Sequence, residues 1–219
     1  MIRRSGTLIE VDHQVLQQLG RLRFATAHQL AYWCDVHATT VTRRLNSMLD
    51  DGLVSAHRHS RPAIWYLSYA GARVIQQPTP TGRRQPSWSV MAHACHTNET
   101  EIVLRQSHAD FRFMDRVALF KQGFNPAHGE HAGVDRNKVS YFVLIDDYAM
   151  TSDRIEHSWQ RRHVPQRKYW SDPAGRAWQE VVNKYCVVTT DAYRAPLHQT
   201  YVRKNHVPAD VIAIKGLWS

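Results

Sequence analysis

The stretch TTVTRRLNSMLDDG, residues 39–52, runs directly into LVSAHRHSRPAIWYL, residues 53–67, and together they decide the fold of the first half of the chain. The apolar residues of the first stretch recur at helical spacing: Val41, Leu45, Met48 and Leu49. Gly52 supplies a C-terminal stop for this helix. The second stretch predicts two short strands, Leu53–Ala56 and Ala63–Leu67, on either side of a polar tip.

Two further helices are predicted upstream. In VDHQVLQQLGRLRF, residues 11–24, the apolar residues again share one face: Val11, Val15, Leu16, Leu19 and Leu22. Thr26 is a good N-cap for a short second helix in AHQLAYWCD, residues 27–35. A connector, Val36–Ala38, then leads into the third helix.

The polar face of the third helix and the hairpin tip form the candidate functional surface. No acidic residue lies between Val36 and Leu49, and such Thr, Asn, His and Arg side chains can hydrogen-bond bases and phosphates. An ordinary solvated face, or a partner-binding module, is the alternative interpretation. The expected DNA-binding residues are His37, Thr39, Thr40, Thr42, Arg43, Arg44, Asn46, His57, Arg58, His59 and Arg61.

Three helices followed by a hairpin is the order of a winged helix-turn-helix, whose third helix enters the major groove. The segments Thr26–Asp35, TTVTRRLNSMLDDGLV and YLSYAGARVI resemble the N-terminal part of plasmid replication-relaxation proteins and, more loosely, bacterial winged-helix regulators. The resemblance covers mainly residues 11–76. It implies that Tyr66, Leu67, Ser68 and Gly71 close the wing and start a further helix.

Composition favours a polyanionic partner. The net charge is +9, and residues 1–90 carry eleven arginines against five acidic residues. No apolar run is long enough to span a membrane, and the N-terminal residues lack a signal segment, so a cytoplasmic location is expected. The three widely spaced cysteines suit reduced core residues better than disulfides: Cys34, Cys95 and Cys186.

The second half predicts a different kind of domain. Residues 77–89 have the composition of a linker between a winged-helix domain at 1–76 and an α/β domain at 90–219. That domain is predicted to begin with a helix, which has His93 and Asn98 in a spacing that weakly resembles the same family. The expected strands follow: Arg116–Lys121, residues 138–150, residues 184–193 and residues 210–216. The fold class is therefore α+β, and a degenerate restriction-endonuclease-like fold is one form the second domain could take.

Three other features invite chemical interpretations. Asp135, Asp146 and Lys168 partly match a metal-dependent nuclease, although strand ends and helix caps use the same residues. The histidines of HACH and AHGEH lack the paired ligand spacing of a zinc site. The run RRHVPQRKYW, residues 161–170, combines basic and aromatic side chains and could contact unpaired bases. The alternative is that its aromatic side chains are core residues and its charged side chains face solvent.

These patterns predict a non-enzymatic, sequence-specific double-stranded DNA-binding protein of a plasmid, phage or satellite. It would act as a transcriptional regulator or as a replication or mobilisation accessory. The alternative is a metal-dependent nuclease or nicking enzyme that the winged helix targets. No cofactor, metal or catalytic residue is expected, and the expected partners are duplex DNA, a second copy of the chain, and a replication or mobilisation protein.

Overall fold

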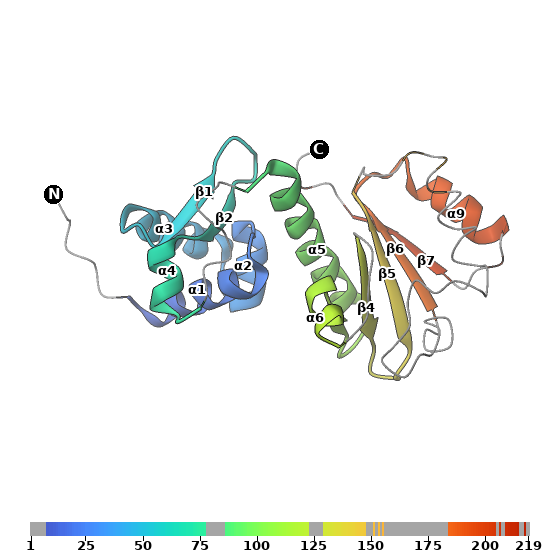
Figure 1. Cartoon of the computed structure of the whole chain (residues 1–219), viewed down its shortest axis with the longest axis horizontal. Coiled ribbons are helices and arrows are strands. Elements are labelled where there is room, and N and C mark those ends of the chain that lie inside the picture. Colours follow the sequence, from blue (N-terminus) through green and yellow to red (C-terminus); the bar gives the residue numbers. More distant parts are fainter. Residues whose placement is uncertain are drawn as a thin grey trace. The chain divides into compact units, whose positions relative to one another are not determined.

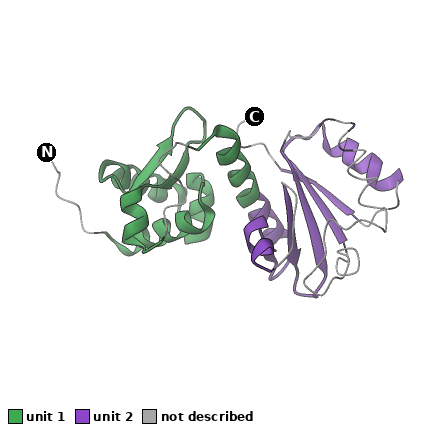
Figure 2. Cartoon of the chain, in the orientation of Figure 1, with its two compact units in different colours: residues 1–99, 218 green, residues 100–217, 219 purple. Residues whose placement is uncertain are grey.

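The computed structural model describes residues 8–77, 86–122, 129–147, 151, 153, 155, 184–204, 206, 209–214 and 217. Within them the chain is a mixed α and β protein that divides into two compact units, one ending at Glu99 and the other beginning at Thr100 (Figure 2). Most of the predicted linker, residues 78–85, lies outside the described residues.

The first unit begins with three helices and a hairpin in the predicted order, and a further helix follows the hairpin (Figure 1). Its elements are α1 (Glu10–Leu22), α2 (Ala27–Cys34), α3 (Ala38–Asp50), β1 (Val54–His57), β2 (Ile64–Leu67) and α4 (Tyr69–Val74). Strands β1 and β2 are antiparallel, and Ala25 pairs with Trp65 beside them. This is the winged helix-turn-helix arrangement that the sequence predicted.

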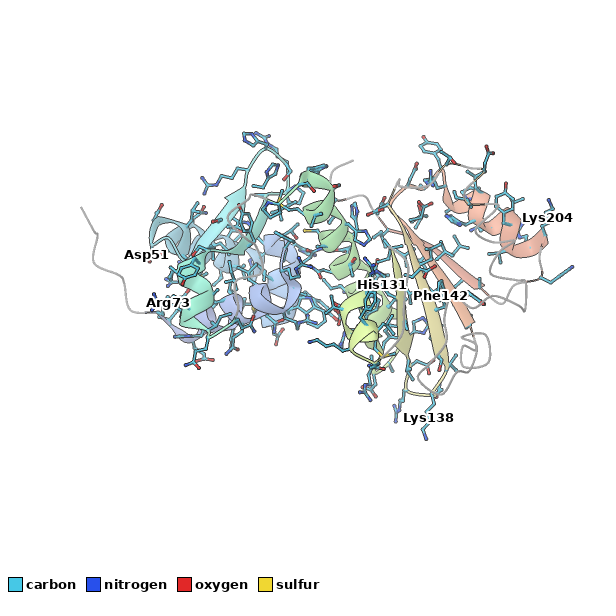
Figure 3. All side chains as sticks on the ribbon, viewed as in Figure 1. Asp51, Arg73, His131, Lys138, Phe142 and Lys204 are labelled. Atoms are coloured by element: carbon cyan, nitrogen blue, oxygen red, sulfur yellow. The ribbon has the colours of Figure 1, made fainter. Side chains whose placement is uncertain are left out.

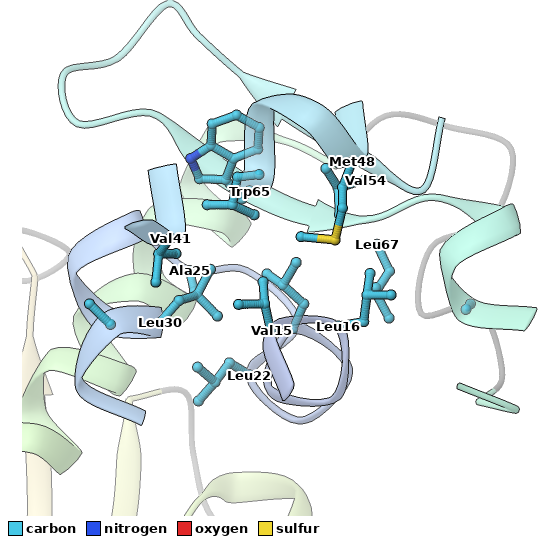
Figure 4. Packing of buried hydrophobic residues seen from close by; sticks show 14 residues of the cluster. Val15, Leu16, Leu22, Ala25, Leu30, Val41, Met48, Val54, Trp65 and Leu67 are labelled. Carbon is cyan, nitrogen blue, oxygen red and sulfur yellow. The ribbon is translucent and has the colours of Figure 1, made fainter. Parts of the chain in front are cut away.

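The apolar stripes of α1, α2 and α3 meet in one core, which also takes in the hairpin (Figure 4). Val15, Leu30 and Leu45 are fully buried there, and Trp65 of β2 is 4% exposed. Thr26 caps α2 reciprocally with Gln29, because the Thr26 hydroxyl accepts the Gln29 N–H and the Gln29 side chain accepts the Thr26 N–H.

The pattern Tyr66-Leu67-Ser68-x-x-Gly71 has a physical basis in this unit. The Ser68 hydroxyl accepts the Gly71 N–H at 3.0 Å and donates to the Gly52 carbonyl at 2.6 Å, so it caps α4 and fastens it to the end of α3. A Cβ on Gly71 would lie 2.0 Å from the Leu53 carbonyl oxygen. Only glycine therefore allows α4 to pack this closely against the start of the hairpin.

Helix α5 (Trp88–Ser107) contributes residues to both units. Its first half packs on the winged helix through polar contacts. The buried Gln29 side chain donates to the Cys95 carbonyl at 2.8 Å and to the Glu99 carboxylate at 3.0 Å, and Asn98 donates to the Phe24 carbonyl at 2.7 Å. The compact unit that holds the winged helix therefore extends into α5.

The second unit is built on a five-stranded sheet in the order β3-β4-β5-β6-β7. Its strands are β3 (Arg112–Met114), β4 (Glu130–Val134), β5 (Ser140–Asp146), β6 (Lys184–Thr189) and β7 (Ala209–Ala213). Strand β4 pairs antiparallel with both β3 and β5, whereas β5 pairs parallel with β6 and β6 pairs parallel with β7.

Alternate residues of the central strands supply the two faces of this sheet. Phe142, Leu144 and Val187 pack with Leu119 and with α9 (Ala195–Lys204). Tyr141, Val143 and Val188 pack on the other face with Leu104 of α5. The strands predicted at 138–150, 184–193 and 210–216 are confirmed as β5, β6 and β7, although each is shorter than its predicted segment.

One predicted element is wrong. Arg116–Lys121 is helix α6, not a strand, because the Asp115 carboxylate accepts the Ala118 N–H at 2.7 Å and caps a helix at this point. The edge strand β3 lies just upstream instead.

Candidate nucleic-acid interface

Helix α3 presents one apolar and one polar face, as its spacing predicted. Val41, Leu45 and Met48 point into the core. Thr39, Thr42, Arg43 and Asn46 are exposed on the other side, and Thr40 is partly buried. Because residues three and four positions apart share a helix face, the exposed side chains form a continuous polar strip.

The beginning of α3 is ordered by His37, which is its N-cap. The His37 ring lies with its Nδ1 atom 2.7 Å from the Thr39 hydroxyl and accepts the Thr39 N–H. The first turn of α3 contains no acidic residue. Its backbone N–H groups and the positive end of the helix dipole therefore favour a negatively charged group nearby.

The hairpin tip supplies the second part of the surface. Arg58, His59 and Arg61 are exposed, while His57 is partly buried. The ring of His57 contacts those of His59 and Trp88, with centroids 5.4 and 5.3 Å apart. Trp88, at the start of α5, was not foreseen from the sequence, which gave no signal linking it to the hairpin.

A hydrogen bond joins the hairpin to α3. The Arg58 guanidinium donates to the Asn46 side-chain oxygen at 2.9 Å, and its Cζ lies 5.8 Å from the centroid of the Trp65 ring. The Asn46 side-chain nitrogen donates in turn to the Thr42 carbonyl at 3.0 Å. We define the wing–helix surface as Thr39, Thr42, Arg43, Asn46, Arg58 and Arg61.

Arg44 is placed differently from the other expected site residues. Its guanidinium donates two hydrogen bonds to the carboxylate of Asp12 on α1, and Asp12 is fully buried. Burial alone would raise the pKa of Asp12, but the hydrogen bonds from Arg44 and the Ile9 N–H, with the charges of Arg44 and His13, hold it below its ordinary value. We therefore assign Arg44 to holding α1 against α3 and leave it out of the wing–helix surface.

The two aspartates considered for a nuclease centre do not meet. Asp135 lies in the turn after β4, and its carboxylate accepts the N–H groups of Asn137 and Val139. Its carbonyl accepts the N–H of Lys138, which Figure 3 labels, at 3.0 Å. Asp146 ends β5, so the length of that strand, about 20 Å, separates the two carboxylates. Lys168 lies outside the described residues, as does the whole run 161–170. A single metal ion cannot bridge Asp135 and Asp146.

Asp146 instead belongs to a buried ion cluster. Its carboxylate accepts bonds from Arg194 at 2.8 and 3.0 Å, and the ring of the fully buried His198 lies 2.8 Å away. These contacts fasten α9 to the end of β5. Sequence analysis did not identify either partner, because both lie about fifty residues further along the chain.

Cysteine and histidine are the side chains that a zinc site would need. All three thiols are free, and burial raises the pKa of Cys34 to about 11 and that of Cys186 to about 12. In the part of the chain that the structure describes, no three His, Cys, Asp or Glu side chains are grouped as a metal would require. His128 of AHGEH is outside that part. None of the helices within it is both long enough and apolar enough to cross a membrane.

Comparison with known proteins gives matches to part of this chain. No curated protein sequence matches it. Eight chains of solved structures match, among them a MarR family transcriptional regulator from Silicibacter pomeroyi DSS. That regulator shares 20% sequence identity over 31% of this chain, with a TM-score of 0.29, and the match spans 46% of its own length.

The match to a family model is more extensive. The replication-relaxation model matches residues 16–118, from α1 to α6, which takes in α2, α3, the hairpin and α5. The resemblance predicted from residues 11–76 is confirmed, because the replication-relaxation model matches residues 16–118 of this chain.

Proposed function

We propose that this chain is a sequence-specific double-stranded DNA-binding protein of a mobile genetic element: a plasmid, phage or satellite. In this proposal α3 enters the major groove and the hairpin contacts the neighbouring backbone. The protein acts as a transcriptional regulator or as a replication or mobilisation accessory. The replication-relaxation match supports the replication-related role.

The observation that carries the proposal is the wing–helix surface itself. It sets exposed Arg43 among the Thr and Asn side chains of α3, and the hairpin tip adds the exposed Arg58 and Arg61. The segment from Val36 to Leu49 contains no acid that would repel phosphate. Each phosphate that an arginine neutralises releases counterions, so affinity should depend steeply on salt. A merely solvated helix face would show no such affinity for DNA.

The test uses the full chain and a random-sequence duplex in fluorescence anisotropy over a range of salt concentrations. The association constant should fall linearly on a double-logarithmic plot, and Arg43→Ala should weaken binding and flatten the slope by about one counterion. Arg136→Ala, which removes an exposed arginine from the turn after β4, is the charge-matched control. Equal effects of the two substitutions, or duplex affinity insensitive to salt, would refute the proposal.

The same proposal extends to the partners of the chain. Winged-helix proteins that bind palindromic sites do so as dimers, so we propose that two copies of the chain bind two half-sites. We further propose that the second unit is a degenerate restriction-endonuclease-like domain that recruits a replication or mobilisation protein in the cytoplasm. Support for a domain without nuclease activity comes from Asp146, whose carboxylate is already engaged by Arg194 and His198.

A further inference from the structure

The side-chain amide of Asn46 is held on two sides within the protein. Its nitrogen donates to the Thr42 carbonyl at 3.0 Å, one turn back along α3, and its oxygen accepts from Arg58 at 2.9 Å. These two partners fix which way the amide faces. A carbonyl can only accept and a guanidinium can only donate, so a flipped amide would set donor against donor and acceptor against acceptor.

Within the residues that the structure describes, the amide keeps one donor and one acceptor for another molecule. An asparagine side chain has two N–H donors and two oxygen lone pairs, and the intramolecular bonds use one of each. Asn46 is exposed, so the remaining N–H and lone pair face solvent on the polar side of α3.

One donor and one acceptor together are what the major-groove edge of adenine requires. Adenine presents its N7 atom as an acceptor and its N6 amino group as a donor, whereas guanine presents two acceptors at the corresponding positions. The amide of Asn46 complements adenine and leaves one guanine acceptor opposite its own oxygen. Thr42 and Arg43, which share this helix face, can contact neighbouring bases or phosphates.

Arg58 is itself held in place. Its guanidinium lies near the ring of Trp65, which is almost fully buried in the core of the first unit. The Asn46 oxygen and the Trp65 ring together define where the Arg58 guanidinium meets α3. The guanidinium of Arg58 has further N–H groups that can contact a phosphate.

We propose that Asn46 recognises an adenine in the DNA site and that Arg58 is the positioning residue that orients its amide for that contact. This inference rests on the proposed function, because it concerns how the wing–helix surface distinguishes one duplex from another. It divides the arginines of the hairpin by role. Arg58 contributes to base discrimination through Asn46, whereas Arg61 contributes to affinity alone.

The experiment is a selection of bound duplexes from a random pool with the full chain, followed by affinity measurements on the selected site. The wild-type protein should select an A·T pair at one position, and replacing that pair by G·C should weaken binding about tenfold or more. Asn46→Ala should remove the preference at that position while preferences at other positions remain. Asn46→Asp, which keeps the shape but loses the amide donor, should also lose the preference for adenine.

Arg58 and Arg61 provide a matched comparison, since both are exposed arginines of the same hairpin tip. Arg58→Ala should relax discrimination at the position read by Asn46, and Arg58→Lys should restore part of it by supplying a donor. Arg61→Ala should weaken binding to all sequences equally. Thermal melting of each variant confirms that it is folded before binding is compared.

The outcomes separate the inference from the proposed function. If the wild-type chain selects a site but Asn46→Ala and Arg58→Ala leave every base preference unchanged, the adenine assignment is wrong and DNA binding stands. The assignment is also wrong if both variants act as Arg61→Ala does, weakening all sequences alike. If the wild-type chain shows no salt-dependent affinity for any duplex, the proposed function fails and the inference fails with it.

Discussion

The guanidinium of Arg44, on α3, donates two hydrogen bonds to the carboxylate of Asp12, on α1. Asp12 is fully buried. The neighbouring Arg43 is exposed on the polar face of the same helix. Two consecutive arginines therefore serve different ends. Arg44 holds the two helices together, and Arg43 lies exposed on the proposed DNA-binding surface.

Replacing each arginine in turn should separate stability from binding. Arg44→Ala leaves the buried Asp12 charge without its partner, which should lower the free energy of unfolding by about 3 kcal/mol. Arg43→Ala should leave stability within about 0.5 kcal/mol of the wild type and weaken duplex binding. Urea denaturation and fluorescence anisotropy, measured on both variants at low temperature, check the two effects. The assignment of roles would be reversed if Arg44→Ala proved as stable as the wild type and lost DNA affinity.

The same pair predicts how stability depends on acidity. The pKa of Asp12 in the folded protein lies below its ordinary value of 3.8, so the ionised form stabilises the fold. This contribution to stability is present above about pH 4, where the carboxyl of Asp12 is ionised in the unfolded chain as well. It is lost as the pH falls through the lower pKa that Asp12 has in the folded protein. Urea denaturation between pH 7 and pH 2 should show that part of the acid destabilisation is missing in Asp12→Asn. Parallel curves for the two proteins would mean that Asp12 is not the responsible group.

Residues close together in the sequence made the first unit predictable. The stripes of α1 and α3 and the Thr26 cap are patterns within a single turn or two, and the structure follows them. The partners of Arg44 and Arg58 were not predictable, since Asp12 and Asn46 lie 32 and 12 positions away. The sequence pattern of a helix indicates which side chains lie on its polar face. It does not indicate which of those side chains form hydrogen bonds with another helix or strand.

The second unit was harder to predict because its local signals conflict. The apolar residues of Arg116–Lys121 suit a strand, yet the Asp115 cap makes the segment helical. Strand β4 was not predicted, because Glu130, His131 and Gly133 interrupt the apolar pattern of a strand. All three residues are nevertheless buried. Gly133 is needed there, since a Cβ would lie 2.1 Å from the ring of Phe111, and only the folded sheet reveals that contact.

Gly71 gives a prediction whose sign opposes the usual effect on a helix. Within a helix, Gly→Ala ordinarily stabilises by up to about 1 kcal/mol. Gly71→Ala should instead destabilise the protein by about 2 kcal/mol or more, because the new Cβ would collide with the Leu53 carbonyl and push α4 from the hairpin. Thermal melting measures the change. Ala70→Gly is a suitable comparison, as Ala70 is exposed on the same helix and should lose only the propensity difference.

The buried cluster of Asp146, Arg194 and His198 supplies the last prediction, and it also tests the nuclease alternative. Asp146→Ala leaves Arg194 and His198 without their shared acceptor, so it should lower the free energy of unfolding by about 3 kcal/mol or more. A structural cluster should confer no cleavage, so supercoiled plasmid incubated with the wild-type chain and Mg²⁺ should remain supercoiled.

A different pattern of plasmid nicking would support the nuclease alternative. Nicking by the wild-type chain that disappears in Asp146→Ala but persists in Asp135→Ala would place a catalytic centre at the end of β5. Asp135→Ala is the informative comparison because its carboxylate binds only the turn after β4 and Tyr141 among the described residues, at the opposite end of the strand. Because about 20 Å separates the two carboxylates, the two substitutions cannot act on one metal ion, and a nuclease of the kind considered would need other ligands beside Asp146.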